Sequence, residues 1–217
     1  MEIQGLDDII VFKYDNTGKL ATTPEVGGLT TNMGKPGLFK IDLASSRGAT
    51  QAEISNMSAT ATKVYGSNAV AEQTIGTASP SISLGANDIP HEIYDTLIGL
   101  EKGKYGSYEQ KQSKLVQGGI IAHSHNTNNN VDLYFAFPLG TFTTGGNLNM
   151  QTNSENPVVA HDAFALAAQA RPSDLLLYAK FYSDDVDFNY DNMLAYITGT
   201  EVAQAPASSK ENVTPEA

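Results

Sequence analysis

The sequence contains no cysteine and no tryptophan, and it has few basic residues. Without cysteine the chain can form no disulfide framework, no cysteine zinc site and no thiol nucleophile. It carries 13 basic against 24 acidic side chains, which gives a formal net charge of −11. A protein that reads the grooves of DNA or RNA needs a basic surface, so this balance argues against that class.

Long hydrophobic runs are also missing. The longest runs, Leu133 to Leu139 and Leu175 to Ala179, are as long as strands and far short of the roughly 20 residues of a membrane helix. The amino end, MEIQGLDD, is acidic from its second residue, which is not typical of a secretory signal peptide. We therefore expect no membrane insertion.

Uncharged polar residues provide much of the polar character instead. The chain has 16 asparagines and 19 threonines, together with 19 glycines and 9 prolines. Threonine favours strands, and asparagine, glycine and proline favour the turns between them. This composition is typical of a mainly β protein with many short strands.

Short apolar or alternating segments, separated by turn residues, indicate where the strands lie. The first predicted strand, residues 8–14, leads into a hairpin tip, DNTG. Residues 23–37 are rich in glycine and proline without periodicity and are predicted to form a long loop, which in a compact domain is usually functional or mobile. Residues 140–146 are predicted as a turn region. The other predicted strands are 38–43, 50–57, 59–65, 69–77, 81–84, 115–125, 131–137, 158–168 and 175–182.

One flanking helix is predicted at about residues 88–102. Asp88 suits its N-cap, Pro90 suits an early helical position, and Gly103 suits its C-terminal end. A second, short helix is preferred to a strand for residues 189–198. The apolar stripe of the first helix consists of Ile89, Ile93, Leu97 and Leu100.

We expect one domain over residues 1–200 and a flexible tail over residues 201–217, which have almost no apolar bulk. Two clusters of charged residues, one basic and one acidic, stand out in the sequence. They are either solvated loops or complementary contacts between neighbouring copies. The basic island is Lys102, Lys104, Lys111 and Lys114, and the acidic cluster is Asp184, Asp185, Asp187 and Asp191.

Known catalytic and metal-binding patterns are not completed. In residues 28–36, five residues separate the glycines where a phosphate loop has four, and a proline follows the lysine. His91 and Glu92 begin a zinc-protease pattern, but Asp95 occupies the position of its second histidine. Residues 185–191 resemble half of a calcium loop that lacks its glycine and bidentate glutamate. We therefore predict no catalytic, cofactor or metal site.

His123 and His125 form the most suggestive histidine cluster. Two histidines at i and i+2 on a strand point to the same face and can share a metal, as they do in cupin barrels. A cupin has a glutamate a few residues later, whereas residues 126–130 are NTNNN, and the only later histidine is His161. We interpret the pair as polar side chains close to a hairpin tip.

Several segments between Asn87 and about Ile197 share a pattern and a spacing with one known family. They are DIPHEIYDTLIGLEKGKYG, VDLYFAFPLGTF, NLNMQTNSENPVVAHDAFALAAQA, LLLYAKFY and NMLAYITG. With these segments the chain resembles the major tail protein of long-tailed bacteriophages, the subunit of the tail tube. The resemblance covers roughly half of the chain. The asparagine-rich tip, the GGNLN segment and the tail depart from it.

The resemblance implies a β-sandwich or small barrel with one flanking helix. It also implies a non-enzymatic structural virion protein whose copies form hexameric rings by continuing their inner sheets around a channel. The rings would stack through a long loop, for which residues 23–37 and the Asn126–Asn130 hairpin are the candidates. Open sheet edges would then serve assembly.

Further expectations about partners and location follow from the same resemblance. The partners would be other copies and other tail proteins, such as the tape measure and tail completion proteins, with no cofactor. The protein would assemble in the host cytoplasm and reside in the virion tail. DNA would pass through the lumen without specific binding, because carboxylates in the wall repel phosphates.

Two other classes fit part of the sequence. A non-catalytic β-sandwich binding module, such as an adhesin or a carbohydrate-binding domain, would share the strands rich in asparagine and threonine. A cupin-like metalloprotein would use the histidine pair. We rank both below the tube subunit.

Overall fold

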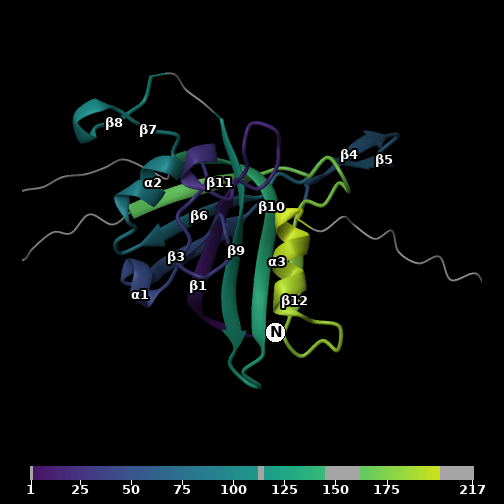
Figure 1. The fold of residues 1–217 in the computed structure, drawn as a ribbon. Coiled ribbons are helices and arrows are strands. Elements are labelled where there is room, and N and C mark those ends of the chain that lie inside the picture. Colours follow the sequence, from purple (N-terminus) through teal and green to yellow (C-terminus); the bar gives the residue numbers. More distant parts are fainter. Residues whose placement is uncertain (1, 112–114, 145–161, 201–217) are drawn as a thin grey trace, which may run out of the picture.

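The structure is a computed structural model and describes residues 2–111, 115–144 and 162–200. Within these ranges the chain is mainly β, as predicted, with an antiparallel sheet of eight strands and two separate two-stranded ribbons (Figure 1). The strands are β1 (Ile3–Lys13), β2 (Leu38–Ile41), β3 (Ala49–Ser55), β4 (Ala61–Gly66), β5 (Ala69–Ile75), β6 (Ser81–Ala86), β7 (Glu101–Lys102), β8 (Tyr108–Glu109), β9 (Val116–Asn126), β10 (Asp132–Thr144), β11 (Asp162–Ala168) and β12 (Ala179–Tyr182). The helices are α1 (Leu43–Ser46), α2 (His91–Leu97) and α3 (Tyr190–Thr198), with 3-10 turns η1 (Pro24–Val26) and η2 (Lys104–Gly106).

The large sheet has the strand order β2-β1-β9-β10-β11-β6-β3 and is not a closed barrel. One of its strands, β10, changes partner along its length: residues 133–136 pair with β12, and residues 140–144 pair with β11. The change occurs at Pro138, where the register with β9 also shifts. Because proline has no N–H to donate and an irregular register bends a strand, the two halves of the sheet can cover different cores.

Residues Ile9–Phe12 of β1, the strand next to the edge strand β2, are buried on both faces of the sheet. Ile9 and Val11 belong to one hydrophobic core, and Ile10 and Phe12 belong to another on the opposite face. Helix α2 contributes to the first core and α3 to the second. Gly119 leaves room for the Phe12 ring, because a Cβ there would lie 2.3 Å from its Cζ. Burial on both faces explains the continuous apolar run from Ile9 to Phe12 in this strand.

Helix α2 flanks the sheet as predicted but, at 7 residues, is about two turns shorter than the predicted residues 88–102. It ends before Gly99, whose φ of 85° is left-handed, and not before Gly103. Asp88 is not its N-cap; the carboxylate of Asp162 accepts the Ile89 N–H at 2.8 Å just before the helix. The stripe Ile89, Ile93 and Leu97 is buried as expected, and Leu100, beyond the helix end, is half-buried.

The second predicted helix is confirmed as α3. The side chain of Asn189 caps its first turn by accepting the Asn192 N–H, and Gly199 ends it with a φ of 69°. Arg171 also caps this C-terminal end, because its Nη1 donates to the carbonyls of Tyr196 at 2.7 Å and Ile197 at 3.2 Å. Neither α3 nor any other helix in the described part of the chain has the length and apolar character needed to cross a bilayer.

Several predicted boundaries were wrong. The region 140–146 was predicted as a turn, but β10 continues to Thr144, since its residues pair with β9 and β11 on both sides. The last strand begins at Ala179 and not at Leu175, because Leu175 has a left-handed φ of 58° in a turn closed by its hydrogen bond to the Arg171 carbonyl. Strand β1 also starts earlier than predicted. Residues 158–161 of the predicted strand 158–168 lie outside the described residues.

Candidate assembly surfaces

Strands β4 and β5 form a hairpin that projects from the body (Figure 1). They pair only with each other, and every residue in both is exposed. The connecting residues Ser67 and Asn68 both have a positive φ, 50° and 64°, as in the type I′ turns that suit the twist of two-residue hairpins. We call Ala61–Ile75 the arm.

The arm exposes large apolar side chains. Tyr65 and Ile75 are 70% and 72% exposed, and Val64 and Val70 are about half exposed. Tyr65 and Val70 lie directly opposite each other near the tip. A two-stranded hairpin is marginally stable alone in water, and exposed apolar patches mark sites of protein contact. The arm is therefore a surface suited to a partner.

The free edge of β2, at one end of the sheet, is covered by the chain itself. The Asn32 side chain accepts the Lys40 N–H at 2.8 Å and donates to the Lys40 carbonyl at 2.7 Å. The hydroxyl of Ser45 donates to the same carbonyl at 2.6 Å. These side chains occupy the outward backbone groups in the middle of β2, which protects the edge against pairing with another strand.

The edge at β12 is open by comparison. Among the described strands, β12 pairs with β10 alone, so its other side has no strand neighbour. Its one charged side chain, Lys180, lies with Nζ 5.1 Å from the centroid of the Phe135 ring on β10. This four-residue strand leaves backbone groups free at the margin of the sheet.

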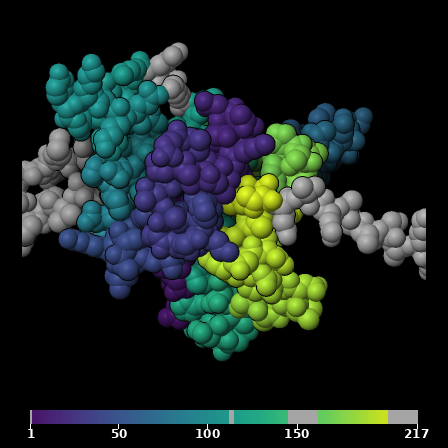
Figure 2. All heavy atoms as spheres, viewed as in Figure 1, coloured from purple at the N-terminus to yellow at the C-terminus, as the bar shows by residue number. Residues whose placement is uncertain are grey.

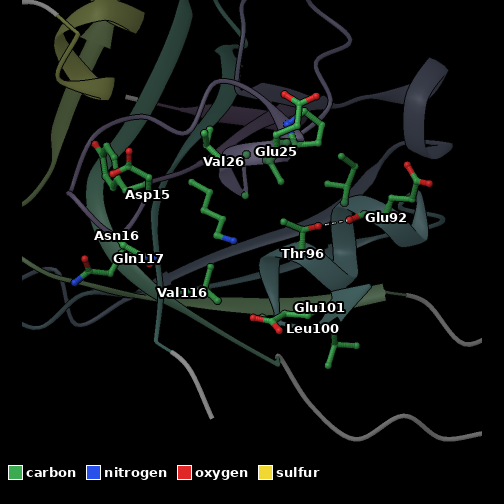
Figure 3. Close-up of a pocket in the computed structure, with 18 of the residues that line it drawn as sticks. Asp15, Asn16, Glu25, Val26, Glu92, Thr96, Leu100, Glu101, Val116 and Gln117 are labelled. Atoms are coloured by element: carbon green, nitrogen blue, oxygen red, sulfur yellow. Dashed lines mark hydrogen bonds between the residues drawn. The ribbon is translucent and has the colours of Figure 1, made fainter. Parts of the chain in front are cut away.

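A groove of about 1000 Å³ lies between residues 13–30 and α2 with the β7 segment, and Figure 3 shows its lining. Its inner wall includes Leu29, Ile93 and Val116, which are buried. Val26 and Leu115 are exposed apolar residues on its lining. The charged lining residues are Asp15, Glu25, Glu92, Glu101, Lys13 and Lys102, so carboxylates outnumber amines. We call this hollow the groove.

His123 lies between two carboxylates near the end of β9. Its Nδ1 is 3.2 Å from Asp8 Oδ2, its Nε2 is 3.4 Å from Asp132 Oδ1, and its ring stacks on Tyr134 with centroids 4.5 Å apart. Burial lowers the pKa of the imidazole, but the hydrogen bond to Asp8 and the charges of Asp8 and Asp132 outweigh it and raise the pKa above its ordinary value. The ring is thus an electrostatic tie between β1 and β10.

The histidine pair does not converge on one position. His125 Nδ1 pairs with Asp7 Oδ2 at 2.8 Å, while His123 is engaged by its own carboxylates. Among the residues that the structure describes, no three histidines or carboxylates are placed to hold a metal. In the run that resembles a calcium loop, Asp185 Oδ1 accepts the Asp187 N–H at 3.0 Å, which makes a local turn before α3. His161 lies outside the described residues.

The sequence model of the phage tail tube protein family matches residues 1–205. The chain belongs to this family. The match includes the sheet, the arm and the groove, and it extends the resemblance inferred from residues 87–197 to the amino-terminal half. No curated protein matches the chain significantly. A tail tube protein is a structural component of the virion tail that self-assembles into tubes, so the relevant sites are contact surfaces.

The loop at residues 23–37 of this tail tube protein is packed against its own body. Leu29 is buried in the first core, and Asn32 is bonded to β2. A Cβ on Gly28 would lie 2.2 Å from the Ala21 carbonyl oxygen, which shows how closely the loop approaches the preceding segment. The Asn126–Asn130 tip is an exposed turn between β9 and β10, as predicted. Their roles in stacking stay predictions.

The predicted charged groups of the tail tube protein make several pairs within the chain. Asp191 of the acidic cluster lies 3.0 Å from Lys35, and Lys111 of the basic island lies 3.5 Å from Glu109. Lys102 and Lys104 are exposed, and Lys114 lies outside the described residues. Contacts of these groups between copies stay a prediction.

Sequence reasoning predicted both strands of the arm but missed its isolation from the body. Most positions in residues 61–75 carry small or polar residues, so neither strand has a continuous apolar face that could pack into a core. That lack was the available signal. The groove was missed entirely, because its lining comes from segments far apart in the sequence.

Proposed function

We propose that copies of this tail tube protein assemble into hexameric rings that stack into a tube, through which viral DNA enters the host. The observation that carries the proposal is the family match over residues 1–205. The projecting arm and the open edge of β12 support it, because a subunit that builds a wall needs surfaces that fit other copies. Contacts between different surfaces of successive copies close into rings or continue as stacks.

The acidic charge suits a conduit for DNA. With a net charge of −11, carboxylates in the wall repel the phosphates of a passing genome. DNA then slides through the tube without being held. The tube needs no catalytic group and no cofactor for this role.

In this proposal residues 1–200 build the wall, and residues 201–217 form a solvated appendage. The stacked rings contact other tail proteins, the tape measure and tail completion proteins, and assembly takes place in the host cytoplasm. Residues 23–37 and the Asn126–Asn130 tip contribute to the contact between rings.

Electron microscopy of the purified, concentrated protein tests the assembly. We expect rings with six-fold class averages and hollow tubes, with particle masses in solution that are multiples of the chain mass. Particles that remain monomers at every salt concentration would falsify the proposal.

A binding assay tests the conduit separately. Assembled tubes mixed with duplex DNA at about 0.15 M salt should retain no more DNA on a filter than a buffer control. Tight binding at this salt concentration would contradict the repulsive wall, whatever the shape of the assembly.

A further inference from the structure

We infer that the arm of one copy docks in the groove of a second copy of this chain. The inference rests on the proposed assembly and adds which two surfaces meet. Both surfaces are described above: the β4–β5 arm with its apolar side chains, and the groove between residues 13–30 and α2.

The apolar character of the two surfaces matches. The arm exposes Val64, Tyr65, Val70 and Ile75, and its two strands pair only with each other. The groove adds Val26 and Leu115 as exposed apolar side chains over a wall of buried ones. These six residues are half of the large hydrophobic side chains that are exposed in the described part of the chain. Tyr65 and its cross-strand partner Val70 share one face of the arm, while Val64 points to the other, so a contact at the first face would remove Tyr65 and Val70 from water together with the apolar lining of the groove.

The charges of the two surfaces are compatible. Residues 54–87, which contain the arm, carry only Lys63 and Glu72 and therefore no net charge, in a chain of net charge −11. The groove is lined by four carboxylates and two lysines, and Figure 3 shows the carboxylates around it. A neutral arm approaches this acidic lining without the repulsion that other parts of an acidic copy would meet. Lys63 can face one of the carboxylates.

The placement of the two surfaces favours contact between different copies. In Figure 1 the arm projects on the right, whereas α2 and the β7–β8 ribbon, which border the groove, lie on the left. Figure 2 shows the arm extending past the body as a separate projection. A projection and a hollow on opposite sides of one molecule form head-to-tail contacts, and these close into rings or continue as stacks.

The size of the groove distinguishes it from a second hollow in the described part of the chain. The second hollow, between residues 20–38 and α3, has about 240 Å³, against about 1000 Å³ for the groove. The tip of the arm presents two large side chains on opposite strands, Tyr65 and Val70. A two-stranded tip therefore suits the larger hollow.

Disulfide trapping tests this contact, because the chain has no cysteine of its own. The test variant carries Ser67→Cys with Val26→Cys, which places one thiol in the exposed turn of the arm and one at the groove while keeping Tyr65 and Val70. The matched control carries Ser67→Cys with Ala195→Cys, which places the second thiol in the smaller hollow. After assembly and mild oxidation, a non-reducing gel should show a ladder of linked chains for the test variant at least tenfold stronger than for the control.

Microscopy of the same samples separates the two proposals. Rings or tubes with the ladder in the test variant support the docking. Rings or tubes without the ladder, or with a stronger ladder in the control, overturn the docking and leave the proposed tube standing. Absence of any assembly in the unmodified chain overturns both.

A second measurement does not depend on thiols. Tyr65→Ser with Val70→Ser should raise the concentration needed for half of the chain to assemble by at least tenfold, because the apolar tip is lost. Val186→Ser changes an apolar residue away from the arm that is more exposed than either of these two and should leave that concentration within twofold. Equal effects of the two changes would overturn the docking.

Discussion

Strand β1 and the arm show two ways in which strands occur in this protein. Strand β1 buries four consecutive apolar residues, Ile9 to Phe12, half of them in each of two cores. The arm has a well-formed turn and a ladder with one register shift, between Val64 and Tyr65, but it buries no side chain. Turn chemistry and strand pairing are thus enough to shape a hairpin, whereas stability from burial needs a second surface. For β1 that surface is in the same chain; for the arm it must come from outside.

This difference separates the free energy of unfolding from the free energy of assembly. Full burial of a large apolar side chain contributes about 1.5–3 kcal/mol. In β1 this contribution is already present in the monomer. In the arm it can arise only when a partner covers the side chains, so changes there should affect assembly and leave the monomer nearly unchanged.

The largest effect on the monomer is expected for Phe12→Ala. Phe12 is fully buried and packs against β9, so its loss should lower the free energy of unfolding by about 3–5 kcal/mol. Urea unfolding of the dilute protein measures this change. The matched change Tyr65→Ala on the arm should stay within about 0.5 kcal/mol. Similar losses for the two variants would remove the distinction between the regions.

A smaller loss is expected for Arg171→Gln. The guanidinium makes two bonds to Asp174, at 3.0 and 2.6 Å, and caps the carbonyls at the end of α3. Losing these charge-assisted bonds should lower the free energy of unfolding by about 2 kcal/mol. Arg171→Lys should recover only part of it, because an ammonium cannot reproduce the planar fork. Full recovery by lysine would show that charge alone matters.

The next effect depends on pH. The pKa of His123 is raised in the folded protein, so its contribution to stability is fully present below the unfolded value of about 6.5 and is lost as pH rises through the folded pKa. The difference in Tm between the unmodified protein and His123→Gln should therefore shrink as the pH rises above about 6.5 and through the raised pKa of the folded protein. Asp8→Asn removes the main partner and should flatten this trend. A difference in Tm that grows with pH would contradict the raised pKa of His123 in the folded protein.

The smallest effect is expected on removing residues 201–217. We predict that these residues are solvated, so their deletion should change Tm by less than about 1 °C and leave ring formation intact. Differential scanning calorimetry and electron microscopy measure the two quantities. Loss of assembly on this deletion would show that the arm is not the only exposed segment that matters.

Much of the fold was predictable because its signals are local. Turn residues between short apolar segments marked most of the strands, and Asn189 with Gly199 marked both ends of α3. The errors had two causes: a local helix stop that the apolar spacing obscured, and strand pairing between distant segments. Leu100 continues the helical spacing, yet Gly99 ends α2, and β10 continues through Pro138 because it has pairing partners on both sides.

The contact surfaces were harder to predict than the fold. A family resemblance pointed to assembly and gave residues 23–37 and the Asn126–Asn130 hairpin as candidates for stacking. Leu29 and Asn32 fix the first of these to the body, and the role of both in stacking stays a prediction. The lack of an apolar face in residues 61–75 is only a weak signal that the hairpin stands alone, because isolation also depends on where the rest of the chain lies. The groove combines three distant segments and exists only after folding.

The side-chain amide of Asn32 makes the two hydrogen bonds to β2 that a residue of a neighbouring strand would make. It satisfies the donor and the acceptor of Lys40 together, at 2.8 and 2.7 Å. A strand from another copy would have to break both hydrogen bonds before it could pair with β2, which costs about 1–3 kcal/mol. This cost protects β2 against pairing with another copy, whereas β12, which has no second strand neighbour among the described residues, can still accept one.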